Sequence, residues 1–415
     1  MIDFELPKPV AMQAQFITML GQQVMRPIAR HYDEHEGERP WDYINLIWQT
    51  VREQGGRTFS TDNKETLDKQ GKPRPKIGNL MLAYIVETLS WGDAGLYLST
   101  PGSALGGAAV DATGTPEQKE RFLRRFAEGE PKWAAMAMTE PHAGSDTASI
   151  RTTARPSEDG SEWILNGEKI FVTGGLMAAQ DSAGFVVIWA TVDPSAGRAG
   201  MKAFVVEANT PGMTVSKLEH KHGIRASDTA SLVLADCRIP RDNILGSAEV
   251  RGDAAGNFKG AMKTFDATRP LVAASAMGIA RASLEFTVDF LKKEGITIRH
   301  GVAPHLLSAI ERDLLQMEAQ VRAGWLLVLR AVTKMDAGED NALEASMCKV
   351  KAGAVANYVS QKAVELLGPE GYSTTHLVEK WMRDARINDI YEGTGQINRL
   401  IVARRLLNYS SRELR

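Results

Sequence analysis

The first third of the chain carries the hydrophobic spacing of α-helices. Near the start, apolar residues recur at intervals of three, one and four, which is typical of one helix face: Phe16, Met19, Leu20 and Val24. Further on, Thr115 followed by Pro116 is a helix start signal, and Gly129 is a stop signal. We therefore predict a helical domain over residues 1–133.

The hydrophobic period changes to two from about residue 134. Asp159-Gly160 and Asn166-Gly167 are dipeptides typical of tight turns. Further strand-like runs follow with no helix between them, at 184–193, 201–208 and 230–240. Short consecutive strands of this kind predict an antiparallel β-barrel or sandwich over residues 134–245.

Helical spacing returns after residue 246. Thr268 and Pro270 are predicted to open a long helix, and a third helix, at about 342–367, is predicted to stop at Gly368. The helix between them is indicated by apolar residues three and four apart: Leu307, Ile310, Leu314, Met317 and Val321. Long helices with short loops predict a four-helix bundle over residues 246–415. The predicted fold class is thus a multi-domain α+β protein.

Composition narrows the function classes. The 415 residues suffice for two or three domains, and a net charge of -2 gives no bulk attraction for nucleic acid or anionic membranes. No apolar run approaches the roughly 20 residues of a membrane helix, and the start has no targeting pattern. The two cysteines form no CxxC pair, which argues against a disulfide framework or a structural zinc site. We expect a cytoplasmic protein, with a polar surface loop over residues 52–78.

Several catalytic motifs are absent from the sequence. There is no GxGxxG after a strand, no GxxxxGK[ST], no HExxH and no GxSxG. The "HKH" stretch at 220–222 has two histidines on one side of an extended chain, but no acidic or cysteine partner follows, so we interpret it as a polar loop. No metal site is predicted.

The segment "NDIYEGTGQINRL", residues 388–400, places Glu392 before a Gly-Thr-Gly turn. Most glutamates are solvated surface residues, and that is the simpler interpretation. A general base held at a helix entrance is the other. Four more segments mix small, polar and apolar residues, and glycine turns with hydroxyls can hold a phosphate-bearing ligand without a Rossmann unit: "MAMTEPHAGSD", "KIFVTGG", "FDATRP" and "LLGPEGY".

Taken together and in this order, these segments resemble the acyl-CoA dehydrogenase family over about residues 75–410. The resemblance implies FAD as cofactor and an acyl-CoA thioester as substrate. It implies that a carboxylate, here Glu392, removes the α-proton while the β-hydride passes to flavin N5, giving a trans-2-enoyl-CoA. Electrons then pass to an electron-transfer flavoprotein. Desolvation is expected to raise the pKa of Glu392, against the opposing effect of the helix start capped by Thr394.

The resemblance also implies roles for individual residues. Asp266, Arg269, Gly393 and Ser145 are expected near the substrate, although Arg269 has the alternative interpretation of a structural ion pair. The residues expected to contact FAD are Met138, Thr139, Ser145, Phe171, Thr173, Gly368, Gly371, Thr394 and Gln396. Phe171 stands where the family usually has tryptophan.

The sequence departs from the family at the "KKEGITIRHGVAPH" loop, which lacks the R-x-x-F-G residues that reach a neighbouring subunit's FAD. His142 replaces a common glycine, and "GPEG" replaces "GG-x-G". Two explanations are open: Arg299 or His300 substitutes, or a related subunit supplies the missing contacts in an α2β2 heterotetramer instead of a homotetramer. A non-catalytic partner subunit and a same-fold flavin oxidase using O₂ are alternative functions. Sequence does not give the length or branching of the acyl group.

Overall fold

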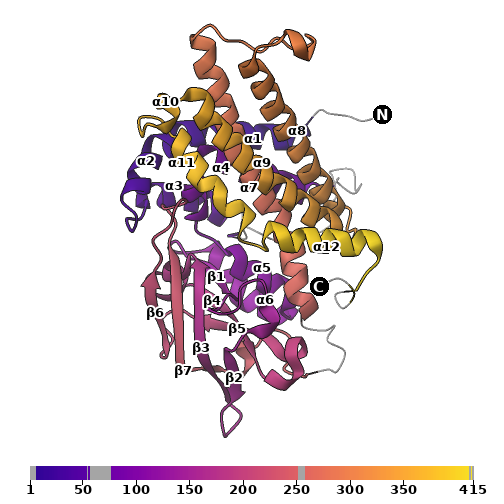
Figure 1. Cartoon of the computed structure of the whole chain (residues 1–415). Helices are drawn as coiled ribbons and strands as arrows, with labels where there is room; N and C mark the ends of the chain where they lie inside the picture. Colours follow the sequence, from indigo (N-terminus) through magenta and orange to yellow (C-terminus); the bar gives the residue numbers. More distant parts are fainter. Residues whose placement is uncertain (1–5, 54, 57–75, 251–257, 411–412, 414–415) are drawn as a thin grey trace, which may run out of the picture.

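The computed structural model describes residues 6–53, 55–56, 76–250, 258–410 and 413. Figure 1 shows a β domain at one end of the molecule and a helical bundle at the other, with the first helices packed beside the bundle. This confirms the predicted α+β class. Most of the surface loop predicted for residues 52–78 lies outside the described residues.

The N-terminal helices are α1 (Lys8–Leu20), α2 (Arg26–Glu34), α3 (Trp41–Glu53), α4 (Gly78–Leu98), α5 (Ala104–Thr113) and α6 (Pro116–Leu123). The helix start predicted at Thr115 is confirmed, and the structure shows a capping box there, with the Thr115 side chain accepting from the Gln118 N–H. The face predicted for α1 is wrong in part: Leu20 is buried, but Phe16 and Met19 are 50% and 46% exposed. The buried residues of α1 are Val10, Ile17 and Leu20, and Gly21, which follows the helix, lies close to Gly92 of α4.

The middle domain is one curled sheet of β1 (Ala134–Ala137), β2 (Thr153–Pro156), β3 (Glu162–Thr173), β4 (Phe185–Thr191), β5 (Met201–Glu207), β6 (Met213–Leu218) and β7 (Thr229–Pro240). The strand order is β1-β4-β2-β3-β7-β6, with β5 on β4. Most pairs are antiparallel, as predicted, but β1 and β2 pair with β4 in parallel, so the sheet is mixed.

One predicted turn in this domain is wrong. Asp159-Gly160 does connect β2 to β3, but Asn166-Gly167 lies inside β3 at a β-bulge. A Cβ at Gly167 would lie 2.5 Å from Thr152 Oγ1, so glycine is needed for close packing and a φ of 151° rather than for a chain reversal.

The C-terminal bundle contains α7 (Phe258–Lys293), α8 (Ala309–Asp336), α9 (Ala342–Leu367), α10 (Pro369–Tyr372), α11 (Val378–Ala385) and α12 (Gly395–Leu407). Gly368, with a φ of 56°, ends α9 as predicted. The predicted start of α7 is wrong, because the helix begins at Phe258 and contains Pro270. Pro270 leaves the Asp266 carbonyl without its helical donor, and the Asn341 side chain donates to it at 3.1 Å.

Helix α7 is the core helix of the bundle. In the described part of the chain, its segment Thr264–Lys293 is the one stretch long and apolar enough to cross a membrane by length and composition alone. However, 67% of its most apolar window is buried inside the protein, where it packs on α4, α8 and α9. This is the environment of a bundle core.

Gly278 in α7 is expected to be required for that packing. A Cβ at this position would lie 2.1 Å from the Glu87 carbonyl oxygen of α4. Alanine normally stabilises a helix interior by about 0.5–1 kcal/mol relative to glycine, but overpacking costs about 1–3 kcal/mol, so Gly278→Ala should be destabilising. Urea unfolding measures this, with Gly144→Ala as the control because a Cβ there meets nothing within 4 Å. Equal midpoints for the two variants would contradict the expectation.

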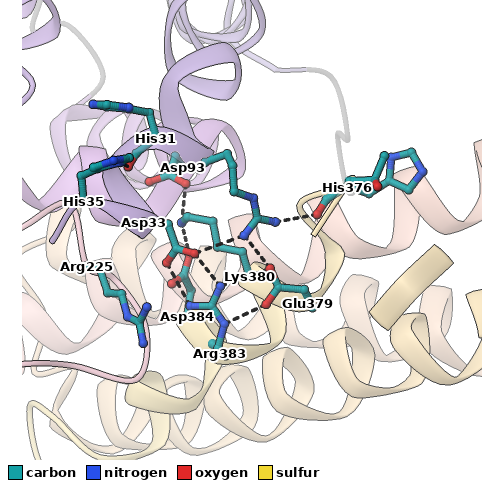
Figure 2. Close-up of polar contacts among 12 residues, drawn as sticks. His31, Asp33, His35, Asp93, Arg225, His376, Glu379, Lys380, Arg383 and Asp384 are labelled. Atoms are coloured by element: carbon teal, nitrogen blue, oxygen red, sulfur yellow. Dashed lines mark hydrogen bonds and ion pairs between the residues drawn. The ribbon is translucent and has the colours of Figure 1, made fainter. Parts of the chain in front are cut away.

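A buried ion cluster joins the three parts of the chain (Figure 2). The Lys380 ammonium lies 2.6 Å from Asp93 and 2.5 Å from Asp384, and all three side chains are 0% exposed. Arg383 in the same helix pairs with Asp33 of α2 at 2.6 Å. Asp384 also accepts the N–H of Ile224, at 2.5 Å, from the loop that follows the "HKH" stretch. The cluster therefore fixes α11 against the N-terminal helices and the β domain.

The "HKH" stretch itself lies in a loop, as predicted. His220 contacts Glu36 at 3.2 Å, and the Lys221 ammonium contacts the same carboxylate at 3.1 Å. Among the residues that the structure describes, no group of three histidine, cysteine or acidic side chains is placed to hold a metal ion.

Candidate active site

A largely apolar cavity of about 190 Å³ lies where the N-terminal helices, the β domain and the bundle meet. Aliphatic side chains from α1, α3, α4 and α7 form most of its wall, among them Ile17, Ile47, Leu82, Ile85, Leu89 and Val272. Thr173 and Gly174 line it from the end of β3, and Tyr391 and Glu392 line it from the turn before α12. One carboxylate thus faces an apolar wall.

Glu392 is held by a hydrogen bond from α7. The Thr268 hydroxyl donates to Glu392 Oε2 at 2.7 Å, and the glutamate is half-buried. Burial raises the pKa of the Glu392 carboxyl above its ordinary value, although the Thr268 hydrogen bond and the charges of Arg269 and Lys349 oppose the rise. The direction agrees with the expectation from the sequence, and such a carboxylate is a stronger base than a solvated one.

The backbone around Glu392 is strained. Glu392 has a φ of 56° and Gly393 one of 87°, so two consecutive residues are left-handed. A non-glycine residue there costs about 1–3 kcal/mol and persists only where neighbours determine the conformation. The Gly393 carbonyl accepts hydrogen bonds from Lys349 and from Asn398, both at 2.8 Å. Arg269 Nε approaches the Glu392 carbonyl at 3.4 Å.

Arg269 forms the structural ion pair that the sequence offered as one interpretation, while its expected place near the substrate stays a prediction. Its guanidinium pairs with Asp266 at 2.8 Å, a structural ion pair, and it also contacts the Glu392 backbone. Burial raises the pKa of the Asp266 carboxyl, with the charge of Arg269 acting against the rise. Arg269 is 3% exposed and belongs to the wall behind the base rather than to the open cavity.

The segments expected to hold FAD meet at the edge of the β domain. The Ile170 N–H donates to the Thr139 carbonyl at 2.9 Å, and the Lys169 ammonium donates to the Met138 carbonyl at 3.0 Å. Lys169 also pairs with Glu140 at 2.7 Å, which fixes the loop that follows Met138. The structure therefore brings the "MAMTEPHAGSD" and "KIFVTGG" segments side by side.

Phe171 is a large aromatic residue that is 62% exposed. It lies at an irregular point of β3 between Lys169 and Val172, with a left-handed φ of 57°. Thr173, two residues on, lines the cavity. An exposed ring held at a strained backbone position next to a cavity fits contact with a planar ring system.

Three other residues predicted for the site are Ser145, Thr394 and Gln396. Ser145 is exposed in the loop after β1, where His142 contacts the Ser149 carbonyl at 3.1 Å. Thr394 caps α12 as predicted, accepting the Ile397 N–H at 3.3 Å. Gln396 is exposed on the same helix.

Gly368 and Gly371 are not brought to the cavity. They form the corner between α9 and α10, and α10 packs on α9 and α11. Figure 1 places α10 at the opposite side of the bundle from α12. Gly371 is buried, and a Cβ there would lie 2.7 Å from the Val364 carbonyl oxygen, so close packing accounts for this glycine within the chain.

Arg299 and His300 are both paired within the chain. Arg299 binds Glu311 through two hydrogen bonds, of 2.7 and 2.8 Å, and donates to the Leu306 carbonyl at 3.0 Å. His300 contacts Glu318 at 2.8 Å. Neither side chain is positioned here as a free cation for a pyrophosphate.

Lys349, Asn398 and the role of Thr268 were not predicted as site features. Lys349 falls on the buried stripe of α9 with Ala345, Ala352 and Ala356. A lysine on an otherwise small and apolar helix stripe was the signal in the sequence that could have identified it.

Comparison with known proteins identifies the relatives of this chain. Residues 11–130, 135–237 and 258–407 match the N-terminal, middle and C-terminal domains described as acyl-CoA dehydrogenase. Human mitochondrial short-chain specific acyl-CoA dehydrogenase is 33% identical over 97% of this chain and 91% of its own length. Acryloyl-CoA reductase (NADH) of Anaerotignum propionicum is 38% identical over 72% of each chain. The structure of butyryl-CoA dehydrogenase from Megasphaera elsdenii is 32% identical, covers 98% of this chain and 100% of that one, and superposes with a TM-score of 0.83.

The fold is that of a family of FAD-binding oxidoreductases. Phe171, Thr173 and the neighbouring Met138–Thr139 segment are the residues that would hold the flavin beside the cavity. The chain belongs to the acyl-CoA dehydrogenase family, whose members are oxidoreductases that act on acyl-CoA.

Proposed function

We propose that this protein is an acyl-CoA dehydrogenase that forms a trans-2-enoyl-CoA, with Glu392 as the base that removes the α-proton. The observation that carries the proposal is the Glu392 carboxylate in the wall of the apolar cavity, hydrogen-bonded to Thr268 and with its pKa raised by burial. The acyl group would occupy the cavity between α4 and α7.

In the proposed reaction, the side chains of this site remove the α-proton of the acyl-CoA thioester. An ionised Glu392 Oε takes the proton from the carbon next to the thioester carbonyl, and the aliphatic wall excludes water that would weaken the interaction. No described residue accepts a hydrogen bond from the Glu392 N–H, so this donor is available to the developing enolate oxygen. FAD, when bound, supplies the acceptor for the β-hydride.

A panel of acyl-CoA thioesters tests this proposal. Purified protein is mixed with each thioester under anaerobic conditions, flavin bleaching is followed, and the product is identified by mass spectrometry. We expect bleaching and loss of two hydrogens with at least one acyl group. Absence of bleaching with straight, branched and cyclic acyl groups alike would contradict the proposal. Repeating turnover in air without an added acceptor separates a dehydrogenase from an oxidase.

Thr268→Val is expected to move the acid limb of the kcat/KM profile to higher pH. The hydroxyl donates to the ionised carboxylate, so its loss raises the pKa of Glu392 further, and the base becomes ionised only at higher pH. Thr287→Val is the matched control, because among the described residues that hydroxyl donates to the Ser283 carbonyl of its own helix and makes no contact with Glu392. An unshifted acid limb in Thr268→Val would contradict this assignment.

We propose electron-transfer flavoprotein as the electron acceptor and a cytoplasmic location. For assembly, we favour a heterotetramer with a related subunit over a homotetramer. The pairing of Arg299 with Glu311 and of His300 with Glu318 supports this, since neither is free to replace a missing pyrophosphate contact. Size-exclusion chromatography of the chain expressed alone tests it, and a stable homotetramer with full flavin content would exclude the heteromer.

A further inference from the structure

Lys349 is a buried cation that the proposed reaction does not use. It lies in α9, and 1% of the residue is exposed. Its ammonium donates to the Gly393 carbonyl at 2.8 Å, and no carboxylate of the described residues lies within ion-pair distance of it. A buried ammonium with a neutral acceptor is costly to maintain, so this lysine requires a cause beyond packing.

The acceptor belongs to the turn that carries Glu392. Both Glu392 and Gly393 are left-handed, and neighbouring groups must impose that conformation. Asn398 holds the Gly393 carbonyl from α12, and Arg269 approaches the Glu392 carbonyl from α7. Lys349 is the contact that ties the same turn to α9, so the base is fixed from three helices.

The charge of Lys349 also acts on the base. The charged and titratable groups that face it are Arg269 of α7, Asp389 before α12, Glu392 in the turn and Cys348 beside it. Burial lowers the pKa of Lys349 to about 8, while Asp389 and Glu392 favour its protonated form. In return, a protonated Lys349 lowers the pKa of Glu392.

We propose that Lys349 is a positioning residue: its ammonium fixes the Gly393 peptide, aims the Glu392 carboxylate into the cavity and favours its ionised form. The inference rests on the proposed role of Glu392 as the base.

Two variants separate the hydrogen bond from the charge. Lys349→Met removes both, whereas Lys349→Gln keeps a donor and removes only the charge. Lys351→Met is the matched control, because Lys351 lies two positions away along the same helix and bonds instead to Gln320 of α8. The measurements are kcat and KM separately, the acid limb of kcat/KM, and hydrogen exchange of the amides at 391–396 without substrate.

We expect Lys349→Met to lower kcat about 100-fold with KM changed less than about threefold, because a small misplacement of the base acts on the chemical step. The acid limb should rise by roughly 0.5–1 unit in both Lys349 variants. Exchange at 391–396 should be faster in Lys349→Met and partly restored in Lys349→Gln.

Wild-type kcat with an unshifted acid limb in Lys349→Met would overturn the proposal. It would also be overturned if the control Lys351→Met showed the lower kcat and the raised acid limb expected of Lys349→Met. If Lys349→Met does not fold, Lys349→Gln decides, and an unshifted acid limb in that variant overturns the proposal. Retention of activity by Glu392→Gln would refute only the assignment of Glu392 as the base. Hydrogen exchange requires no turnover, so it would still show whether Lys349 holds the turn at 391–396.

Discussion

Glu392→Gln is expected to lower kcat by about 10²–10⁴-fold while the protein keeps its fold and its flavin. An amide cannot accept the α-proton, so the chemical step loses its base. The fold should survive because the Thr268 hydroxyl can donate to the amide oxygen as it does to Glu392 Oε2. Stopped-flow flavin bleaching under anaerobic conditions measures the loss.

Glu365→Gln is the matched control for this experiment. Glu365 is exposed on α9, where it pairs with Lys362, and its replacement should leave the rate unchanged. If Glu392→Gln bleached its flavin at the wild-type rate, Glu392 would not be the base, and another group would have to remove the α-proton. A large loss confined to Glu392→Gln excludes that alternative.

Lys380→Met is expected to be among the most destabilising single changes in the chain, by about 3–5 kcal/mol. Burial alone would lower the pKa of Lys380, but the facing carboxylates of Asp384 and Asp93 raise it and keep the ammonium charged. Removing the ammonium leaves two unexposed carboxylates 2.5–2.6 Å from where it was, without a counter-charge. The urea midpoint of far-UV circular dichroism measures the change.

Two further variants make this prediction specific. Arg322→Met breaks an exposed pair with Glu318 and should change stability by less than about 1 kcal/mol. Adding Asp93→Asn and Asp384→Asn to Lys380→Met removes the uncompensated charges and should restore part of the loss. If Lys380→Met and Arg322→Met shifted the midpoint equally, the buried cluster would contribute no more than a surface pair.

Local signals predicted the parts of the structure that depend on near neighbours. The helical, β and helical stretches, the caps at Thr115 and Thr394, and the stop at Gly368 each depend on residues within a few positions. The local pattern left Glu392 open between a solvated surface carboxylate and a general base, and the resemblance to the acyl-CoA dehydrogenase family implied the base.

Long-range contacts account for the failures. Asn341 donates to the Asp266 carbonyl from 75 positions away and so allows Pro270 inside α7. Asn166-Gly167 lies at a bulge where Gly167 packs against Thr152, and β1 pairs in parallel with β4, which is distant from it in sequence. Lys349 contacts Gly393 from 44 positions away, so the turn sequence alone could not name its partner.

The ion cluster around Lys380 has a consequence for how the polypeptide matures. Arg383 and Asp33 are 350 positions apart, so this pair can form only when synthesis is nearly complete. Until then, a nascent chain emerging from the ribosome carries Asp93 without Lys380, and Asp33 with Arg30 of its own helix but without Arg383. Protection of the N-terminal helices by chaperones, and their exposure to proteases, should therefore end only when α11 has been made.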